Sequence, residues 1–398
     1  MNDTPAPFGE LSTIGSDQFA ASFGEPLERA LDPCTWLPGE YLNQIYCRIE
    51  AEVEAADRLN DDLRAAIRQQ FFGRIDDFRR ASPDLGDEIG WYAATPDVIR
   101  RQHVGLLFPG RVEAVDGTCV DHETLPLTVL SIGVVLVAYD GDHGSWGHRL
   151  FRRDLRLQGT LSLPEIIAIM KARTRRNDHT ASSHDRLSEL GRDGIMAYME
   201  RAVLLDFAKA PWRLGHGNPV AFPMLTGAGS MEFLHHSLAL LRKLIDYQRF
   251  VYVQSRLTDR ELLTIGQALQ PLEYFVYDTA EEAMRRVVES ETYTRHYRKE
   301  ASDFVREYGP KIVRGVYRAS ASAPPHVFYA HRERIHEAAL IALADSTMQE
   351  HRGFPLLIDL ADSVARTTFD PTSTKNLVRT AYAARGKPYR YLNERDIR

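Results

Sequence analysis

Arg111-Val-Glu-Ala-Val-Asp-Gly-Thr118 is the stretch of this sequence that says most about the fold. The residues before Asp116 suit a β-strand, and Gly117 follows at once. Residues 125–138 form a second apolar strand candidate, so we expect a hairpin with the carboxylate where the first strand meets its turn. Glycine permits a tight turn and leaves the approach to the carboxylate free of a side chain. Such a strand end often carries a metal ligand, although Asp-Gly is also an ordinary hairpin turn pair.

The composition is that of a soluble globular protein of 398 residues, with 44% hydrophobic and 26% charged residues and a net charge of −6. The total charge does not advertise nucleic-acid binding, for which local basic surface matters more. Three widely spaced cysteines give neither a disulfide framework nor a zinc site. The N-terminus shows no signal peptide, and the longest apolar run, 125–138, is too short to cross a bilayer. We therefore expect a cytoplasmic protein with no membrane segment.

The pattern along the chain divides it into three parts. Residues 1–35 are rich in Gly, Pro, Ser and Asp, and we expect them to be loosely ordered. Within residues 36–105, apolar side chains recur every three or four positions from Leu42 to Ile75, which predicts a helical extension and a possible dimer interface. Residues 106–398 would then form the main domain.

Strand and helix patterns in the main domain indicate an α/β fold. Strands are expected at 111–115, 127–139 and 148–157, followed by strands and helices in alternation. Helices are expected at 163–175, 185–209, 231–246 and 259–269, and strands at 219–225, 250–254, 274–277, 312–318 and 327–330. Paired strands followed by this alternation predict a mixed sheet with helices on both faces.

Glu200 is the second candidate carboxylate, because it lies in the apolar helical segment 195–205. Glu189 and Asp193 precede it on roughly the same helical stripe. The alternative is an ordinary solvated helix face, with Arg192 and Arg201 as partners.

Asp362 is the third candidate. The segment 354–362 runs from Pro355 into an expected helix, where proline suits the first turn, and Asp359 shares a face with Asp362. A mixed helix surface is again the alternative. Together Asp116, Glu200 and Asp362 make a widely spaced acidic set of the kind that holds hard divalent cations. Two such ions can clamp the attacking and leaving oxygens of a phosphodiester.

At these positions the sequence resembles the NurA nuclease family, whose core is similar to ribonuclease H. Val115-Asp116-Gly117-Thr118 matches the family's first strand motif, and Met199-Glu200 is similar to its helical glutamate. Phe354-Pro355 and Ala361-Asp362 stand where the family has Tyr-Pro and Ala-His. The resemblance implies a DNA nuclease dependent on Mn²⁺ or Mg²⁺, with Asp116, Glu200 and Asp362 as catalytic metal ligands. It also implies a homodimer that works with a hexameric HerA-type ATPase in DNA end processing, repair or phage defence.

The sequence departs from the family pattern at the third acidic motif. Pro223-Met-Leu-Thr-Gly-Ala-Gly-Ser-Met231 is the expected position, with Thr226 or Ala228 where the family has aspartate. Neither side chain replaces a charged ligand, and Glu232 is the nearest acid that could. The terminal histidine has become Asp362, which suits hard cations.

Two other groups of residues have local chemistry. The first is a polar cluster in a Gly-rich hairpin, which could bind metal or be an exposed turn: Asp140, Asp142, His143 and His148. The second is a basic run that could contact DNA phosphates or simply balance the acidic residues: Lys171, Arg173, Arg175 and Arg176. No P-loop, dinucleotide fingerprint or nucleophile elbow is present.

Three hypotheses follow from the sequence. The first is a metal-dependent DNA nuclease with a ribonuclease H-like core. The second, favoured by Thr226 and Ala228, is a NurA-like subunit that has lost catalysis and binds DNA or assembles with the ATPase. The third is an unrelated α/β protein in which Asp116-Gly117 is only a turn.

Overall fold

The computed structural model describes residues 15–36, 42–81, 85–124, 127–152, 162–168, 171, 186–255, 260–289 and 295–389. The chain forms two compact units, Met1–Asp62 and Leu63–Arg398. Within the described ranges, no helix combines the length and apolar character that crossing a bilayer requires. The division into residues 1–35, 36–105 and 106–398, with a dimer interface in the second part, stays a prediction.

The first unit is helical in its described part. It contains α1 (Ser16–Phe23), α2 (Leu27–Leu31), the 3₁₀ turn η1 (Pro33–Thr35) and most of the long helix α3 (Leu42–Ala66). The helix predicted from the spacing of Leu42 and the apolar residues after it is thus confirmed.

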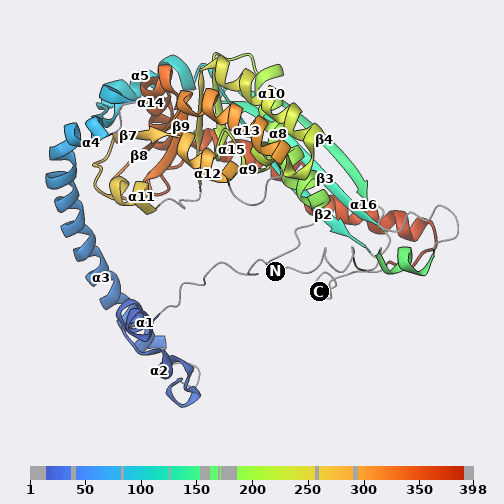
Figure 1. Cartoon of the computed structure of the whole chain (residues 1–398), viewed down its shortest axis with the longest axis horizontal. Helices are drawn as coiled ribbons and strands as arrows, with labels where there is room; N and C mark the ends of the chain where they lie inside the picture. Colours follow the sequence, from blue (N-terminus) through green and yellow to red (C-terminus); the bar gives the residue numbers. More distant parts are fainter. Residues whose placement is uncertain are drawn as a thin grey trace, which may run out of the picture. The chain divides into compact units, whose positions relative to one another are not determined.

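The second unit is built on one mixed sheet of nine strands (Figure 1). The strand order across the sheet is β1-β7-β8-β9-β6-β5-β2-β3-β4. In chain order the strands are β1 (Gly90–Ala93), β2 (Val112–Glu123), β3 (Thr128–Ala138), β4 (Gly141–Arg152), β5 (Trp212–His216), β6 (Phe250–Val253), β7 (Glu273–Thr279), β8 (Ile312–Arg318) and β9 (His326–His331).

Strand direction divides this sheet into two parts. The consecutive strands β2, β3 and β4 are antiparallel, whereas β5 lies parallel to β2 and β6 parallel to β5. This part of the sheet has the strand order β4-β3-β2-β5-β6. The strands β9, β8, β7 and β1 extend it by antiparallel pairing.

Helices surround the sheet (Figure 1). Before β5 they are η2 (Ile67–Phe71), η3 (Phe72–Arg74), α4 (Ile75–Ala81), η4 (Gly86–Glu88), α5 (Pro96–Gln102), η5 (His103–Leu107), α7 (Arg186–Glu189), η6 (Leu190–Gly194) and α8 (Ile195–Asp206). After β5 they are α9 (Phe222–Thr226), η7 (Gly227–Gly229), α10 (Met231–Tyr247), α11 (Arg260–Gln267), α12 (Glu281–Glu289), α13 (Arg295–Tyr308), η8 (Gly309–Lys311), η9 (Arg332–Arg334), α14 (Ile335–Ser346), α15 (Leu356–Thr368) and α16 (Pro371–Ala384).

Helices α8 and α15 cover opposite faces of the sheet at β2 and β3. A Cβ on Gly117 would meet Glu200 of α8, whereas one on Gly133 would meet the ring of Phe369 at the end of α15. Gly133 pairs with Thr118, so it shares a face with Thr118 and not with Gly117. Every residue of β3 is buried, as expected for a strand covered on both sides. The predicted fold class, a mixed sheet between helices, is confirmed.

The predicted strand end at Asp116 is wrong, because β2 continues through Asp116 and Gly117 to Glu123. Gly117 is paired with Val134 in the ladder to β3, so it is not a turn residue. What ends near Asp116 is the pairing with β5, whose last partner on β2 is Val115. From Asp116 onward the β5 side of β2 is therefore open to side chains from the helices.

The predicted strand at 219–225 is also wrong. That segment contains the short helix α9, whose first turn accommodates Pro223, a residue with no N–H to give to a sheet. The strand that pairs with β2 is β5, whose pattern is obscured by a buried Arg213 and by Gly215. Arg213 is tolerated because its guanidinium donates hydrogen bonds to the carbonyls of Ala208 and Ala210.

Gly215 offers a test of this packing. A Cβ added there would overlap the buried ring of Tyr252 on β6, so we expect Gly215→Ala to lower the free energy of unfolding by about 1–3 kcal/mol. Gly105→Ala, where an added Cβ meets nothing within 4 Å, is the matched control. Chemical denaturation of both variants measures the difference. Equal stabilities would contradict this account of the β5–β6 pairing.

Candidate functional site

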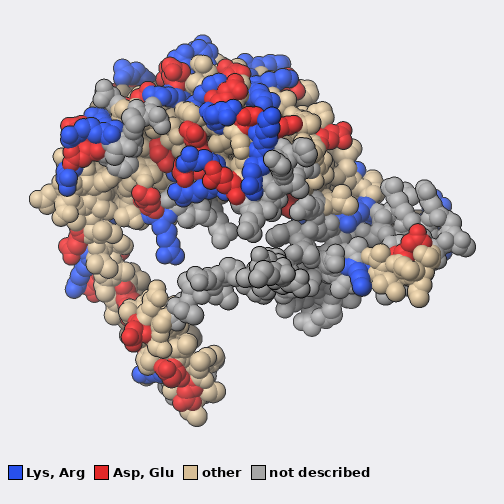
Figure 2. Space-filling view, viewed as in Figure 1, with Lys and Arg blue, Asp and Glu red and all other residues tan. Residues whose placement is uncertain are grey.

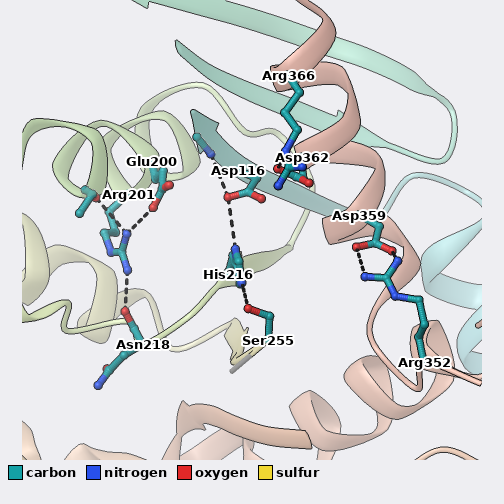
Figure 3. Close-up of polar contacts among 12 residues, drawn as sticks. Asp116, Glu200, Arg201, His216, Asn218, Ser255, Arg352, Asp359, Asp362 and Arg366 are labelled. Atoms are coloured by element: carbon teal, nitrogen blue, oxygen red, sulfur yellow. Dashed lines mark hydrogen bonds and ion pairs between the residues drawn. The ribbon is translucent and has the colours of Figure 1, made fainter. Parts of the chain in front are cut away.

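Asp116 lies where β2 and β5 separate, and it is only 5% exposed. Its Oδ1 accepts a hydrogen bond from the Gly117 N–H at 2.9 Å and lies 3.5 Å from Nδ1 of His216 (Figure 3). Because Val115 pairs with Gly215, the next residue of each strand points to the same face of the sheet. Asp116 and His216 are thus neighbours across two parallel strands.

Glu200 approaches from α8 on the other side of β2, and it has room there because Gly117 carries no side chain. A Cβ on Gly117 would stand 2.7 Å from Oε1 of Glu200 and 2.9 Å from Cγ of Met196. Any other residue at position 117 would push the carboxylate away. The predicted alternative of a solvated helix face is wrong for Glu200, which is 8% exposed.

Arg201 holds the other oxygen of Glu200. Its guanidinium donates to Glu200 Oε2 at 2.6 Å and to the carbonyl oxygens of Asn218 at 2.5 Å and Pro219 at 3.1 Å (Figure 3). It is almost fully buried and lies over the ring of Tyr252, 5.1 Å from its centroid. One cation therefore joins α8, the segment after β5 and a core strand.

The pKa of Glu200 is set by its burial and by the charged groups around it. Burial raises its pKa to about 7, and the negative charge of Asp116 acts in the same direction. The positive charges of Arg201 and His216 lower the pKa but do not cancel the effect of burial. Asp116 is therefore close enough to Glu200 to disfavour its ionised form.

His216, the last residue of β5, was not among the predicted site residues. Its Nε2 shares a 2.8 Å hydrogen bond with Ser255, and its ring meets the ring of Phe354 edge-on at 5.7 Å. Burial lowers the pKa of His216, but the hydrogen bond to Asp116 and the charges of Asp116, Glu200 and Asp362 raise it above its usual value. The three predicted carboxylates thus act on one imidazole.

Asp362 reaches this group from α15, which packs beside β2 (Figure 3). Its Oδ1 accepts a hydrogen bond at 2.8 Å from Arg366, whose side chain is 72% exposed. Asp359, one turn earlier, has a different role: it accepts hydrogen bonds from Arg352 and Gln349 and fixes the segment before the helix.

The start of α15 is fixed by a buried carboxylate. Asp345, at the end of α14, accepts hydrogen bonds from the Leu357 N–H at 2.9 Å and from the Tyr139 hydroxyl at 2.5 Å. Burial raises the pKa of Asp345 to about 6, although both hydrogen bonds lower it. This arrangement sets the position from which α15 presents Asp362.

The expected replacements for a third acid lie elsewhere. Thr226 ends α9, where its hydroxyl donates to the Phe222 carbonyl and accepts from the Ala228 N–H. Ala228 lies in η7 with a positive φ of 43°. Glu232 is exposed in the first turn of α10 and makes no polar contact with Asp116, Glu200 or His216 in the described structure. Its role as a metal ligand stays a prediction.

The polar hairpin cluster is a structural network. His143 Nδ1 lies 2.6 Å from Glu113, a buried carboxylate of β2, and its Nε2 lies 3.1 Å from Asp140. Asp142 accepts from the Gly144 N–H, and His148 is exposed on β4. Across the part of the chain that the structure describes, no three His, Cys, Asp or Glu side chains are arranged to hold a metal ion.

The predicted basic run is placed only in part. Lys171 is exposed, whereas Arg173, Arg175 and Arg176 lie outside the described residues. On the face shown in Figure 2, Lys and Arg side chains alternate with Asp and Glu over the helices. The role of these four residues in binding DNA stays a prediction.

No protein-family model and no curated protein matches the chain. Among solved structures, it is similar to the NurA nuclease from Sulfolobus solfataricus, with 9% identity over 83% of this chain and 97% of that one and a TM-score of 0.42. A structure of NurA with manganese is 8% identical over 75% of this chain and 96% of that one, with a TM-score of 0.42. Endonuclease V from Ciona intestinalis, in complex with inosine-containing DNA, is 13% identical over 65% of this chain and 84% of that one, with a TM-score of 0.27. Identities and scores this low do not assign a function.

The pKa of Glu200 gives a testable prediction. A carboxyl group whose pKa rises on folding favours the folded state only while protonated, so this contribution is lost as the pH rises from 4.5 to about 7. We expect Glu200→Gln to gain stability relative to the wild type over this range, on the order of 2–3 kcal/mol. Asp116→Asn should shift the effect to lower pH, because the charge of Asp116 raises the pKa.

Urea denaturation at a series of pH values measures these differences. Glu232→Gln, at an exposed carboxylate, is the control. A stability difference between Glu200→Gln and the wild type that stays constant from pH 5 to pH 8 would refute the assigned electrostatics.

Proposed function

We propose that this protein is a metal-dependent DNA nuclease of the NurA type, hydrolysing phosphodiester bonds. The observation that carries the proposal is that Asp116, Glu200 and Asp362, from β2, α8 and α15, lie near one another and near His216 (Figure 3). These carboxylates are far apart in the sequence, and two of them are buried. Burying acids costs free energy unless a function or a partner compensates.

The types of side chain at the site suit a hard divalent cation, Mn²⁺ or Mg²⁺, but no three of the described side chains already stand close enough together to hold one, so binding would have to draw them inward. Such ions prefer carboxylate oxygens, and the site offers three carboxylates. The charge of Asp116 raises the pKa of Glu200, so a cation placed between them would relieve repulsion. When bound, the ion would supply positive charge to the phosphate and make water a better nucleophile.

The chain's own residues hold and orient this site. Arg201 fixes Oε2 of Glu200, which leaves Oε1 turned toward Gly117 beside Asp116. Asp345 sets the start of α15 and thereby the place of Asp362. Phe354 packs against His216 and excludes water from one side of its ring. We assign Asp116, Glu200 and Asp362 to the cation.

The partners of this activity follow from the motif resemblance. It suggests DNA as the substrate, a homodimer as the active form and a hexameric HerA-type ATPase as the partner, in end processing, repair or phage defence. Co-purification of the full chain with such an ATPase, read out by size-exclusion chromatography, tests the partnership separately from the chemistry.

Asp116→Ala tests the activity. With Mn²⁺ or Mg²⁺ the wild type should degrade linear single- or double-stranded DNA, with or without the ATPase. Loss of even a supporting residue costs metal sites roughly 10–100-fold, so removal of a direct ligand should lower the rate by more than about 100-fold. Asp121→Ala, an exposed aspartate on the same strand, is the control and should retain activity. Equal rates for Asp116→Ala and the wild type would refute the assignment.

A second candidate function is a NurA-like subunit without catalysis. The specific observation that favours it is that each acid of the site has a basic partner within the chain: Asp116 with His216, which is a cation when protonated, Glu200 with Arg201, and Asp362 with Arg366. A site neutralised in this way has less need of a metal ion. No cleavage by a folded protein that still binds DNA or the ATPase would establish this alternative.

The basic run provides a separate prediction about DNA. If Lys171, Arg173, Arg175 and Arg176 bind phosphates, replacing all four with alanine should weaken binding to DNA of any sequence. The slope of log affinity against log salt should fall by about 0.7–0.9 for each phosphate that is no longer neutralised. Fluorescence anisotropy at several salt concentrations measures this slope. An unchanged slope would mean that other residues bind the phosphates.

A further inference from the structure

His216 has a position that none of the sequence motifs assigns. It ends β5, the parallel neighbour of β2, and its Nδ1 faces the carboxylate of Asp116 at 3.5 Å. We propose that His216 is a nitrogen ligand of the cation in the proposed site and makes this site select Mn²⁺ over Mg²⁺. This inference rests on the proposed function and specifies its metal chemistry.

The geometry of the two donor atoms supports a shared ion. Ligand atoms that sit about 2.0–2.3 Å from one metal ion, in adjacent positions, are roughly 3–3.5 Å apart. The separation of Nδ1 and Oδ1, 3.5 Å, is at the upper end of this range. Both atoms are held by strands of one sheet, so the pair is positioned before any ion binds.

The other side of the imidazole is arranged as a ligand histidine requires. Metal-binding histidines use their second ring nitrogen to donate a hydrogen bond that fixes the ring. Nε2 of His216 lies 2.8 Å from the Ser255 hydroxyl, and Phe354 packs edge-on against the ring. In the tautomer that carries its proton on Nε2, directed at Ser255, Nδ1 would offer its lone pair to a cation placed between it and Asp116.

Selection between the two metals follows from ligand type. Mg²⁺ prefers oxygen ligands and gives up water reluctantly, so replacing a carboxylate by imidazole weakens its binding. Mn²⁺ also binds oxygen but lies in the series of transition metals that accept imidazole. A site with His216 among carboxylates should therefore favour Mn²⁺. The alternative role for His216 is that of a permanent counter-ion to Asp116.

Pulsed electron paramagnetic resonance of the full chain with Mn²⁺ separates these roles, because a coordinated imidazole gives a ¹⁴N coupling to the manganese spin. We expect this coupling in the wild type and in His235→Ala, a control at an exposed histidine of α10. It should be absent in His216→Ala and in His216→Asp. Circular dichroism should show all variants folded.

Calorimetric titration with each metal tests the selectivity. His216→Asp should shift the ratio of Mn²⁺ to Mg²⁺ affinity toward Mg²⁺ by about tenfold or more. Mn²⁺ binding that needs Asp116 but gives no ¹⁴N coupling, or an affinity ratio unchanged in His216→Asp, would overturn the role of His216 and leave the nuclease proposal standing. A wild-type protein that binds neither metal would overturn both.

Discussion

The buried ion pair between Arg201 and Glu200 is the contact on which the arrangement of the site depends. Arg201 is a full positive charge inside the core, and it is accommodated because Glu200 and three main-chain carbonyls accept its hydrogen bonds. Removing one partner of such a pair costs about 3–5 kcal/mol, since the other charge stays buried. The consequence is positional: two of these carbonyls belong to Asn218 and Pro219, just after His216, so the cation that fixes Glu200 also fixes the end of β5.

The site exists because two parallel strands separate at a defined residue. Asp116 and His216 point to the α15 face, while Gly117 faces α8 and leaves space for Glu200. A sheet would normally keep residues on its opposite faces apart. Here the pairing between β2 and β5 ends after Val115, and Gly117 has no side chain, so the charge of Asp116 on one face reaches Glu200 on the other. The glycine matters through the space it leaves, not through a turn.

The sequence predicts those parts of this structure that have a local pattern of apolar residues or prolines. The three antiparallel strands, the helix carrying Glu200 and the entry into α15 at Pro355 follow from apolar periodicity and from proline. His216 could not be found this way, because its strand is five residues long and carries a buried arginine, which breaks the apolar pattern expected of a core strand. Its importance comes from pairing with β2, a contact across about a hundred residues that no spacing rule encodes.

The basic partners of the three acids differ in how easily a metal ion could take their place. Arg366 is mostly exposed, and a surface pair of this kind contributes about 0–1 kcal/mol, so Asp362 can exchange it for another cation at little cost. Arg201 is buried and bound on four sides, so it stays with Glu200 Oε2 and leaves Oε1 as the oxygen available to a ligand. His216 is the partner that can change roles without moving, because the same Nδ1 that faces Asp116 can bind a metal as a neutral nitrogen. In the proposed metal site, Arg201 is therefore the fixed cation that shapes the site, and Arg366 and His216 are the partners that a metal ion would displace or convert.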